Sequence, residues 1–127
     1  MTEIKYIYKC EICGNIVEVI HQGPGILVCC GQPMTLMEAK TSDPEKGEKH
    51  IPVIENSEEN FLVKIGEVPH PMTNEHHIEW IELVTEVGIY RKHLNGDKAE
   101  VVFTKPKEKI ISIREYCNLH GLWEKIL

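Results

Sequence analysis

The sequence lacks any apolar run of the roughly 18 residues that a membrane-spanning helix needs. Its N-terminus has no apolar segment of signal-peptide length, and the chain contains no internal repeat or low-complexity tract. Positive charge is scarce, because 14 lysines and arginines face 20 aspartates and glutamates, for a formal net charge of −6. Nucleic-acid-binding proteins normally carry a clustered basic face. These absences predict a cytoplasmic protein with neither a membrane nor a nucleic acid as its partner.

Cysteine is limited to five residues, and their spacing leaves none over for a disulfide. Four of them form two pairs, Cys10-x-x-Cys13 and the adjacent Cys29-Cys30, separated by fifteen residues. In a reducing compartment, paired thiols more often bind a metal than form disulfides. The interval between the pairs resembles that of a zinc ribbon. The spacing therefore predicts one four-thiolate metal site, which zinc and iron both accept.

The adjacent pair departs from the zinc-ribbon pattern. Neighbouring side chains on an extended strand point to opposite faces, so Cys29 and Cys30 can bind one ion only if the backbone bends between them. Residues 1–38 contain three short β-type segments, at 6–8, 15–20 and 26–29, separated by glycines and prolines. So short a segment can hardly bury a core of its own, and a metal staple is expected.

The chain turns polar and charged over residues 39–47, which we interpret as a linker. β-type patterning then recurs in five segments, at residues 61–65, 78–87, 89–93, 100–104 and 109–116. The second of these also fits a helical spacing, but Gly88 and the neighbouring strands favour a strand. Asn95-Gly96-Asp97 predicts a hairpin between the third and fourth. Residues 48–127 are therefore expected to form a small β-sandwich.

A second group of ligand-type residues lies in this part of the chain. Cys117 and His120 are three residues apart and can chelate one ion across a turn. His70 and His76 are separated by a proline, which excludes the helical spacing of a zincin and places them on a loop and at the start of the next strand. With His50 they make four imidazoles and one thiolate. That is one ligand too many for a structural zinc, and it suits a transition metal with an open coordination position.

Other residues of these types are expected to be structural. Histidines outside any paired motif are interpreted as surface or core residues: His21, His77 and His93. The large aromatic side chains near the ligands are expected to belong to the sandwich core: Trp80, Tyr116 and Trp123. Met72 is expected to contribute packing rather than a ligand.

At these residues the sequence resembles the desulfoferrodoxins, the two-iron superoxide reductases. The resemblance covers nearly the whole chain and rests on three motifs in order, Glu48-Lys49-His50-Ile51-Pro52, His70-Pro71-Met72 with its following His76, and Cys117-Asn118-Leu119-His120-Gly121. It implies an all-β protein, in which a small desulforedoxin-like, metal-stapled domain precedes an immunoglobulin-like β-sandwich. It also implies a homodimer, two mononuclear irons per chain and a rubredoxin as electron donor.

The resemblance further implies a role for each ligand. The first iron would be held by four thiolates: Cys10, Cys13, Cys29 and Cys30. The second would have four equatorial imidazoles and one axial thiolate opposite a vacant position: His50, His70, His76 and His120, with Cys117. The implied reaction is the one-electron reduction of superoxide to hydrogen peroxide.

Two residues beside the second site are the expected catalytic pair. Lys49 offers a local positive charge that attracts the superoxide anion to an acidic protein. Glu48 resembles the carboxylate that closes the vacant position after oxidation and helps peroxide leave. Two other functions stay open on the sequence: an electron carrier with a closed second site, and a zinc-stapled interaction module without redox activity.

Overall fold

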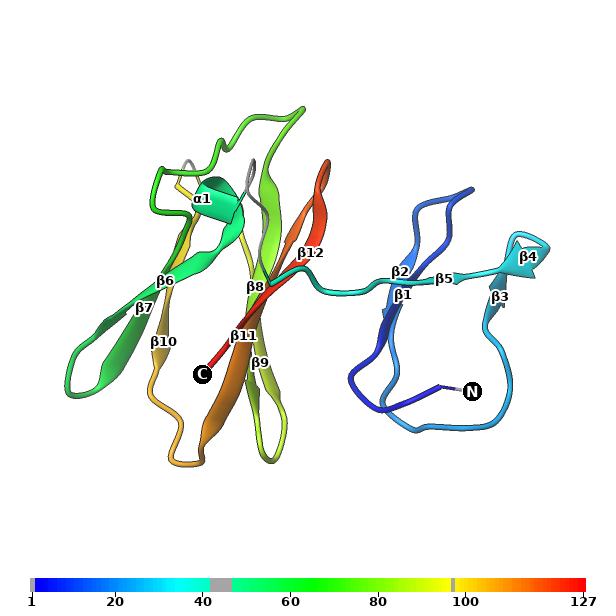
Figure 1. The fold of residues 1–127 in the computed structure, drawn as a ribbon, viewed down its shortest axis with the longest axis horizontal. Helices are drawn as coiled ribbons and strands as arrows, with labels where there is room; N and C mark the ends of the chain where they lie inside the picture. Colours follow the sequence, from blue (N-terminus) through cyan, green and yellow to red (C-terminus); the bar gives the residue numbers. More distant parts are fainter. Residues whose placement is uncertain (1, 42–46, 97) are drawn as a thin grey trace. The chain divides into compact units, whose positions relative to one another are not determined.

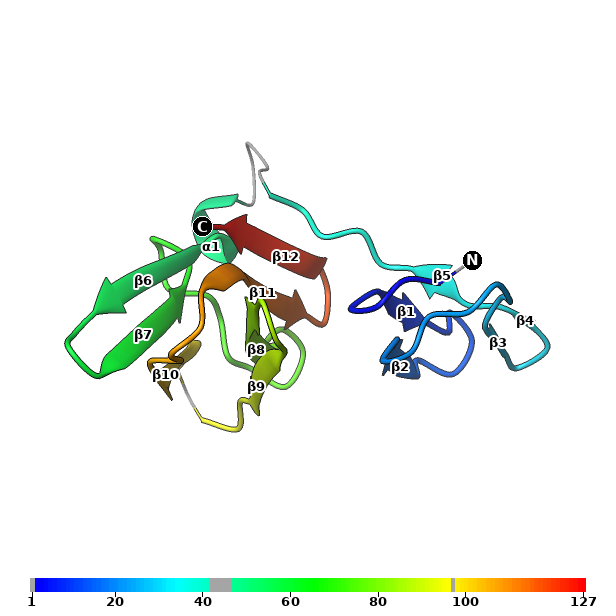
Figure 2. The ribbon, with the colours of Figure 1, turned by 90° about the horizontal axis from the view of Figure 1, so that it is seen from below.

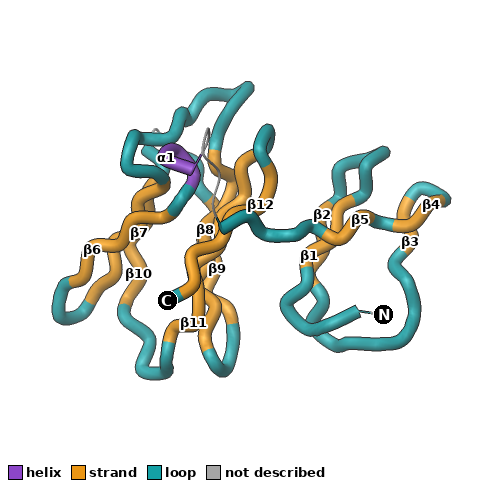
Figure 3. Tube along the Cα trace, viewed as in Figure 1, coloured by secondary structure: helices purple, strands orange, loops and turns teal. Residues whose placement is uncertain are grey.

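The structure is a computed structural model that describes residues 2–41, 47–96 and 98–127, with only the backbone described at 47 and 48. The chain divides into two compact units, Met1–Glu38 and Ala39–Leu127. Both are built from antiparallel strands, and the helix in the described residues is the four-residue α1 (Gly47–His50) (Figures 1 and 3). The expected all-β fold is confirmed. The expected division into domains at residues 1–38 and 48–127 stays a prediction, and most of the expected linker at 39–47 lies outside the described residues.

The first unit is a set of short strands around a very small core. Three of them form an antiparallel sheet in the order β2 (Ile16–Glu18), β1 (Ile7–Lys9), β5 (Thr35–Leu36), and β3 (Val28–Cys29) pairs with β4 (Gln32–Pro33). Its buried hydrophobic residues are Ile7, Cys10 and Val19. Burying three side chains contributes about 5–9 kcal/mol, at roughly 1.5–3 kcal/mol each, whereas ordering the backbone costs about 1–2 kcal/mol per residue. This imbalance agrees with the expectation of a metal staple.

The second unit is a sandwich of two antiparallel sheets (Figures 1 and 2). The three-stranded sheet has the order β10 (Glu100–Thr104), β7 (Asn60–Ile65), β6 (Pro52–Asn56). The four-stranded sheet has the order β12 (Gly121–Ile126), β11 (Ile110–Cys117), β8 (Ile78–Thr85), β9 (Ile89–His93). The segment that also fitted a helix is therefore strand β8, as expected, and β9 and β10 match their expected ranges.

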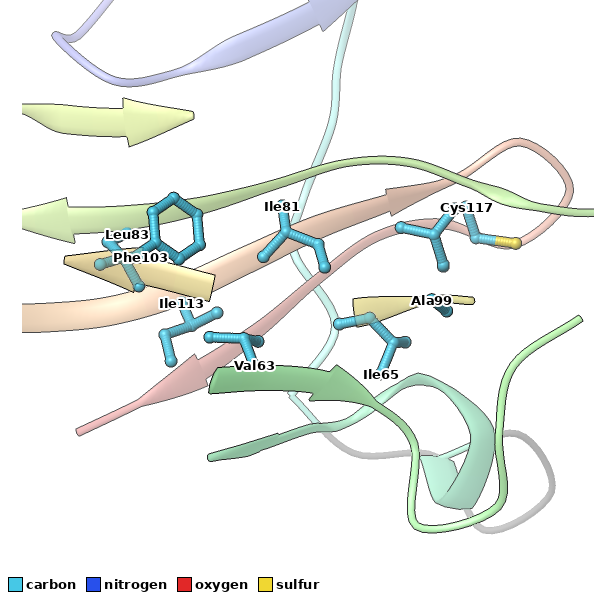
Figure 4. Packing of buried hydrophobic residues seen from close by; sticks show 9 residues of the cluster. Val63, Ile65, Ile81, Leu83, Ala99, Phe103, Ile113 and Cys117 are labelled. Atoms are coloured by element: carbon cyan, nitrogen blue, oxygen red, sulfur yellow. The ribbon is translucent and has the colours of Figure 1, made fainter. Parts of the chain in front are cut away.

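The core of this unit lies between the two sheets (Figure 4). Alternate residues of β7, β8 and β11 point inward, as the two-residue period of a strand requires. The cluster contains Val63, Ile65, Ile81, Leu83, Phe103, Ile113 and Cys117. Cys117 lies at one end of this row of side chains, the end at which α1 is also seen (Figure 4). The sandwich therefore holds one candidate ligand rigidly at the margin of its core.

The expected hairpin at Asn95-Gly96-Asp97 is wrong. β9 pairs with β8 in the four-stranded sheet, whereas β10 pairs with β7 in the three-stranded sheet. The segment therefore crosses from one sheet to the other, and residue 97 itself lies outside the described residues. An Asn-Gly pair favours a local reversal of the chain. For β10 this local preference is overridden by packing, because Phe103 lies in the core cluster when β10 pairs with β7.

The three aromatic residues expected in the core are buried, but in different places. Trp123 is fully buried and contacts a candidate ligand. Trp80 and Tyr116 stack on each other with ring centroids 5.9 Å apart and do not belong to the cluster between the sheets. They lie beside Glu82, a buried carboxylate that accepts hydrogen bonds from Arg91 and Arg114. This correction follows from alternation, since Ile81 and Leu83 of the same strand face inward.

Candidate metal centres

The four-cysteine group is built from two tight turns of the first unit. Cys10 follows β1 and Cys13 lies in the turn after it, while Cys29 ends β3 and Cys30 begins the turn to β4. The four sulfurs lie within 4.8 Å of one another. Cys30 has a positive φ of 53° and is followed by Gly31 at 79°. The backbone thus bends at the adjacent pair, as two neighbouring ligands of one ion require.

The charges of these four thiols depend on one another. The backbone N–H of Cys13 donates to the Cys10 sulfur at 3.4 Å, and this bond is the main reason why the pKa of Cys10 is lowered to about 6. Hydrogen bonding to the Cys13 thiol raises the pKa of Cys30 to about 12. Four thiolates so close together repel one another unless a cation lies among them. The group therefore fits a tetrahedral ion with four sulfur ligands.

The second group gathers ligands from three separate segments of the sandwich. His50 is the last residue of α1, His70 and His76 lie on the loop between β7 and β8, Cys117 ends β11, and His120 lies in the turn to β12. Both loop histidines therefore precede β8, although His76 was expected at its start. One ligand atom from each of the five lies within 4.8 Å of all the others. The structure brings together all five residues that the motifs indicated.

The distances inside this group fit a bound transition metal. The Nε2 atoms of His50 and His70 lie 3.1 Å apart, and Nε2 of His50 lies 3.2 Å from Nδ1 of His120. Two nitrogens that bind one ion at about 2.1 Å, at right angles, lie about 3.0 Å apart. Nε2 of His76 is buried without a hydrogen-bond partner among the described residues, which a metal bond would satisfy. Iron suits such a set of imidazoles and one thiolate.

The protonation states of these ligands suit metal binding as well. Burial lowers the pKa of His70 to about 4, so its ring is neutral and its Nδ1 lies 2.7 Å from the Pro71 carbonyl oxygen. The pKa of the Cys117 thiol is raised overall, because the effect of burial exceeds the opposing effect of the backbone N–H groups of Leu119 and His120. Those N–H groups favour the thiolate, which is the form that binds a metal.

Trp123 supports two of the ligands at once. Its ring stacks on His50, with centroids 4.5 Å apart and planes inclined by 12°. Its indole Nε1 donates to the His120 carbonyl oxygen at 3.2 Å, and Lys40 covers the ring with its ammonium nitrogen 5.2 Å from the centroid. The expectation that Trp123 merely fills the core is therefore incomplete, because it also orients His50 and His120.

The two expected catalytic residues differ in what the structure describes. The backbone of Glu48 belongs to α1, but its side chain lies outside the described residues. The Lys49 side chain is exposed, and its charge contributes to lowering the pKa of His76, after the larger effect of burial. A positive charge thus lies close enough to the group to act on one of its ligands.

Three further residues lie next to the second group and were not predicted to contribute to it: Gly66, Glu115 and Asn118. Gly66 has a φ of +86°, and a Cβ there would lie 2.7 Å from backbone carbon atoms of Lys49. Glu115 is fully buried two residues before Cys117, and burial raises its pKa well above the usual carboxyl range. Asn118 was noted only as part of a motif. A glycine just after a predicted strand was the available signal for Gly66, and a carboxyl within the β-type segment 109–116 for Glu115.

The remaining histidines and Met72 do not contribute ligand atoms to either group. His21 and His93 are exposed, and Nδ1 of His77 lies 2.8 Å from the Thr73 carbonyl oxygen. Met72 packs against the core cluster, as expected, and its sulfur also accepts the Ile78 N–H at 3.4 Å.

Comparison with known proteins places both units in one family. A family model described as "Desulfoferrodoxin, N-terminal domain" matches residues 2–37, and one described as "Desulfoferrodoxin" matches residues 42–126. A desulfoferrodoxin homolog of Archaeoglobus fulgidus is 54% identical over 125 residues, which cover 98% of each chain. A desulfoferrodoxin of Syntrophotalea carbinolica is 54% identical over 127 residues, which cover 97% of each chain.

The likeness extends to solved structures. The superoxide reductase from Treponema pallidum has a TM-score of 0.78 and 30% identity, covering 94% of this chain and 96% of that one. The expected immunoglobulin-like sandwich and the small domain before it are thereby confirmed. Matching models over both units and half-identical relatives over nearly the full length show that this chain belongs to the desulfoferrodoxin family.

Proposed function

We propose that this protein is a superoxide reductase, which converts superoxide, one electron and two protons into hydrogen peroxide. The observation that carries the proposal is the second group: four imidazole nitrogens and one sulfur within 4.8 Å, beside the exposed charge of Lys49. The group holds one mononuclear iron, and the four-cysteine group holds another. A bound iron with a thiolate ligand supplies the single electron, because the sulfur is a strong electron donor.

The residues around the iron have separate tasks. Burial lowers the pKa of His70 and of His76, which favours the neutral imidazoles that bind a metal. Cys117 binds as a thiolate, a form that the backbone N–H groups of Leu119 and His120 favour and that burial opposes until a cation is bound. Lys49 attracts the superoxide anion, which an acidic protein would otherwise repel. The carboxylate of Glu48, one residue before, acts after oxidation and assists the departure of peroxide.

Replacing Lys49 tests the attraction of the substrate. Lys49→Ala is expected to slow the reaction with pulse-generated superoxide by about tenfold or more, because steering of an anion by charge falls in that range. The remaining rate should depend less on ionic strength, since salt screens exposed charges beyond about 8–10 Å. The rate is measured at low and high salt with the iron reduced beforehand.

Two variants separate this effect from a general loss of positive charge. Lys107→Ala removes one exposed lysine from the β10–β11 loop, outside the site, and should leave the rate unchanged. Glu48→Ala should also leave the first bimolecular step unchanged and alter the spectrum of the oxidised site instead. An equal slowing in Glu48→Ala and Lys49→Ala would show that steering does not belong to Lys49 alone.

The four-cysteine iron is dispensable for the reaction. All ligands of the second site lie between His50 and His120, inside the second unit. Cys13→Ser is therefore expected to abolish the four-thiolate iron spectrum, while superoxide reduction persists at close to the wild-type rate. Loss of reactivity in this variant, with the second iron still bound, would contradict the division of tasks.

Metal analysis with a visible spectrum separates this function from the two alternatives. A superoxide reductase contains iron in both sites and changes colour on oxidation. An electron carrier with a closed second site would consume no superoxide, and a zinc-stapled interaction module would contain zinc and show no redox change.

We also propose a cytoplasmic homodimer that receives electrons from a rubredoxin and serves in superoxide detoxification. The five cysteines form no disulfide, and their use as metal ligands fits a reducing compartment. In the residues described, no helix is long and apolar enough to cross a membrane. Several apolar side chains of the first unit are exposed and offer a surface that a second copy could cover: Ile4, Ile12, Ile20, Ile26 and Val28.

A further inference from the structure

The side chain of Asn118 joins two of the segments that carry ligands of the second iron. Asn118 directly follows Cys117, and its Nδ2 donates to the Glu75 carbonyl oxygen at 3.0 Å. Its Oδ1 accepts the N–H of His77 at 2.8 Å. In addition, its own backbone N–H donates to the His77 carbonyl oxygen at 3.1 Å. Three hydrogen bonds thus link the residue after the thiolate to a loop more than 40 positions earlier in the sequence.

The two side-chain bonds of Asn118 are made to the peptide groups on either side of His76. The Glu75 carbonyl belongs to the peptide group before His76, and the His77 N–H belongs to the peptide group after it. Other backbone bonds of His76 stay within its own turn, where it exchanges hydrogen bonds with Thr73. His76 lies outside a strand or helix, unlike His50 and Cys117. Its position relative to the sulfur therefore depends on the contacts of Asn118.

We propose that Asn118 is a positioning residue that holds His76 at a fixed place relative to Cys117, an inference that rests on iron binding to this group under the proposed function. The carboxamide suits the task because it offers a donor and an acceptor on one rigid plane. Both halves of that plane are used, one on each side of His76. A side chain with only one of these capacities leaves one peptide group beside the ligand without its partner.

Two variants test the proposal on the full chain loaded with ferrous iron. Asn118→Ala removes both side-chain bonds, and the isosteric Asn118→Asp keeps an acceptor for the His77 N–H but places an oxygen against the Glu75 carbonyl. In each variant the affinity of the second site for iron, measured by competition with a chelator, is expected to be about 10- to 100-fold weaker than in wild type. This is the usual effect of removing a partner that orients a metal ligand. The visible band of the oxidised second site should also shift.

The sign of the Asn118→Asp effect separates positioning from charge. An added carboxylate near a bound cation strengthens binding by electrostatic attraction alone. Weaker iron binding in Asn118→Asp therefore shows the effect of losing the hydrogen bond to the Glu75 carbonyl. Unchanged or tighter iron binding would overturn the proposal. Asn56→Asp adds the same charge at the far end of β6, where its side chain is exposed, and is expected to change neither the affinity nor the spectrum.

The first iron site serves as an internal control. Its spectrum should be identical in all four proteins, because its ligands lie in the other unit. If the iron-free Asn118→Asp protein proved to be unfolded, Asn118 would be a general support of the fold and the proposal would fail. If wild type bound the second iron as expected but reduced no superoxide, the proposed function would fail while the positioning role stood.

Discussion

Cys117→Ser is expected to lower the rate of superoxide reduction by about 100-fold or more, even in molecules that retain the second iron. The sulfur is fully buried at the margin of the core and lies 3.8 Å from Nδ1 of His120. A serine hydroxyl is a harder and weaker donor, so the iron loses both a bond and the electron density that the thiolate provides. Iron content, visible spectrum and consumption of pulse-generated superoxide are measured on the same sample.

The matched comparison is Cys13→Ser, which removes a thiolate from the other group and should leave reduction intact. Replacing any single histidine ligand should lower the rate less than Cys117→Ser does. Three imidazole ligands remain in such a variant, whereas Cys117 is the group's single sulfur ligand. A Cys117→Ser protein with wild-type iron content and turnover would contradict this account of the sulfur.

Gly66→Ala should destabilise the second unit by about 2–5 kcal/mol. The positive φ of +86° costs an alanine about 1–2 kcal/mol. The added methyl would also lie 2.5 Å from the Val68 carbonyl oxygen and 2.7 Å from the Lys49 backbone, and such overpacking costs about 1–3 kcal/mol. The melting temperature followed by circular dichroism should fall by roughly 10 °C or more.

The same substitution should displace Lys49, since relief of the overlap requires α1 or the β7–β8 loop to move. The reaction of folded Gly66→Ala with superoxide is therefore expected to slow and to lose part of its salt dependence, as in Lys49→Ala. Gly88 provides the control, because an added Cβ there meets nothing within 4 Å. A Gly66→Ala protein as stable as Gly88→Ala would show that the close approach to Lys49 is unimportant.

Ligand identity was largely predictable because chelation by neighbouring residues is a local property. Cys10-x-x-Cys13 and Cys117-x-x-His120 place two ligand atoms on one turn wherever that turn lies in the fold. Strand β7 was predictable for a similar reason, because Phe61, Val63 and Ile65 alternate with other residues along the sequence. The bend at Cys30 also followed from two adjacent ligands and was confirmed by a positive φ.

Pairing between distant segments was not predictable in the same way. The Asn95-Gly96 signal for a hairpin was overridden because β9 pairs with β8 and β10 pairs with β7, in different sheets. The roles of Gly66 and Asn118 depend on backbone groups of Lys49, Glu75 and His77, which any residue type supplies. Spacing and composition therefore carry no trace of these contacts.

The sequence by itself determined which residues could bind the two metals and five of the strands of the second unit, because both follow from residue type and local spacing. It did not predict β6 and β12. Only the tertiary structure decided how the ligands meet. His76 and His77 are neighbours of the same chemistry, yet Nε2 of His76 points into the ligand group and Nδ1 of His77 contacts the Thr73 carbonyl. The hydrogen bonds of Asn118 hold the peptide groups on both sides of His76, and they exist only once β8 and β11 have paired within the four-stranded sheet.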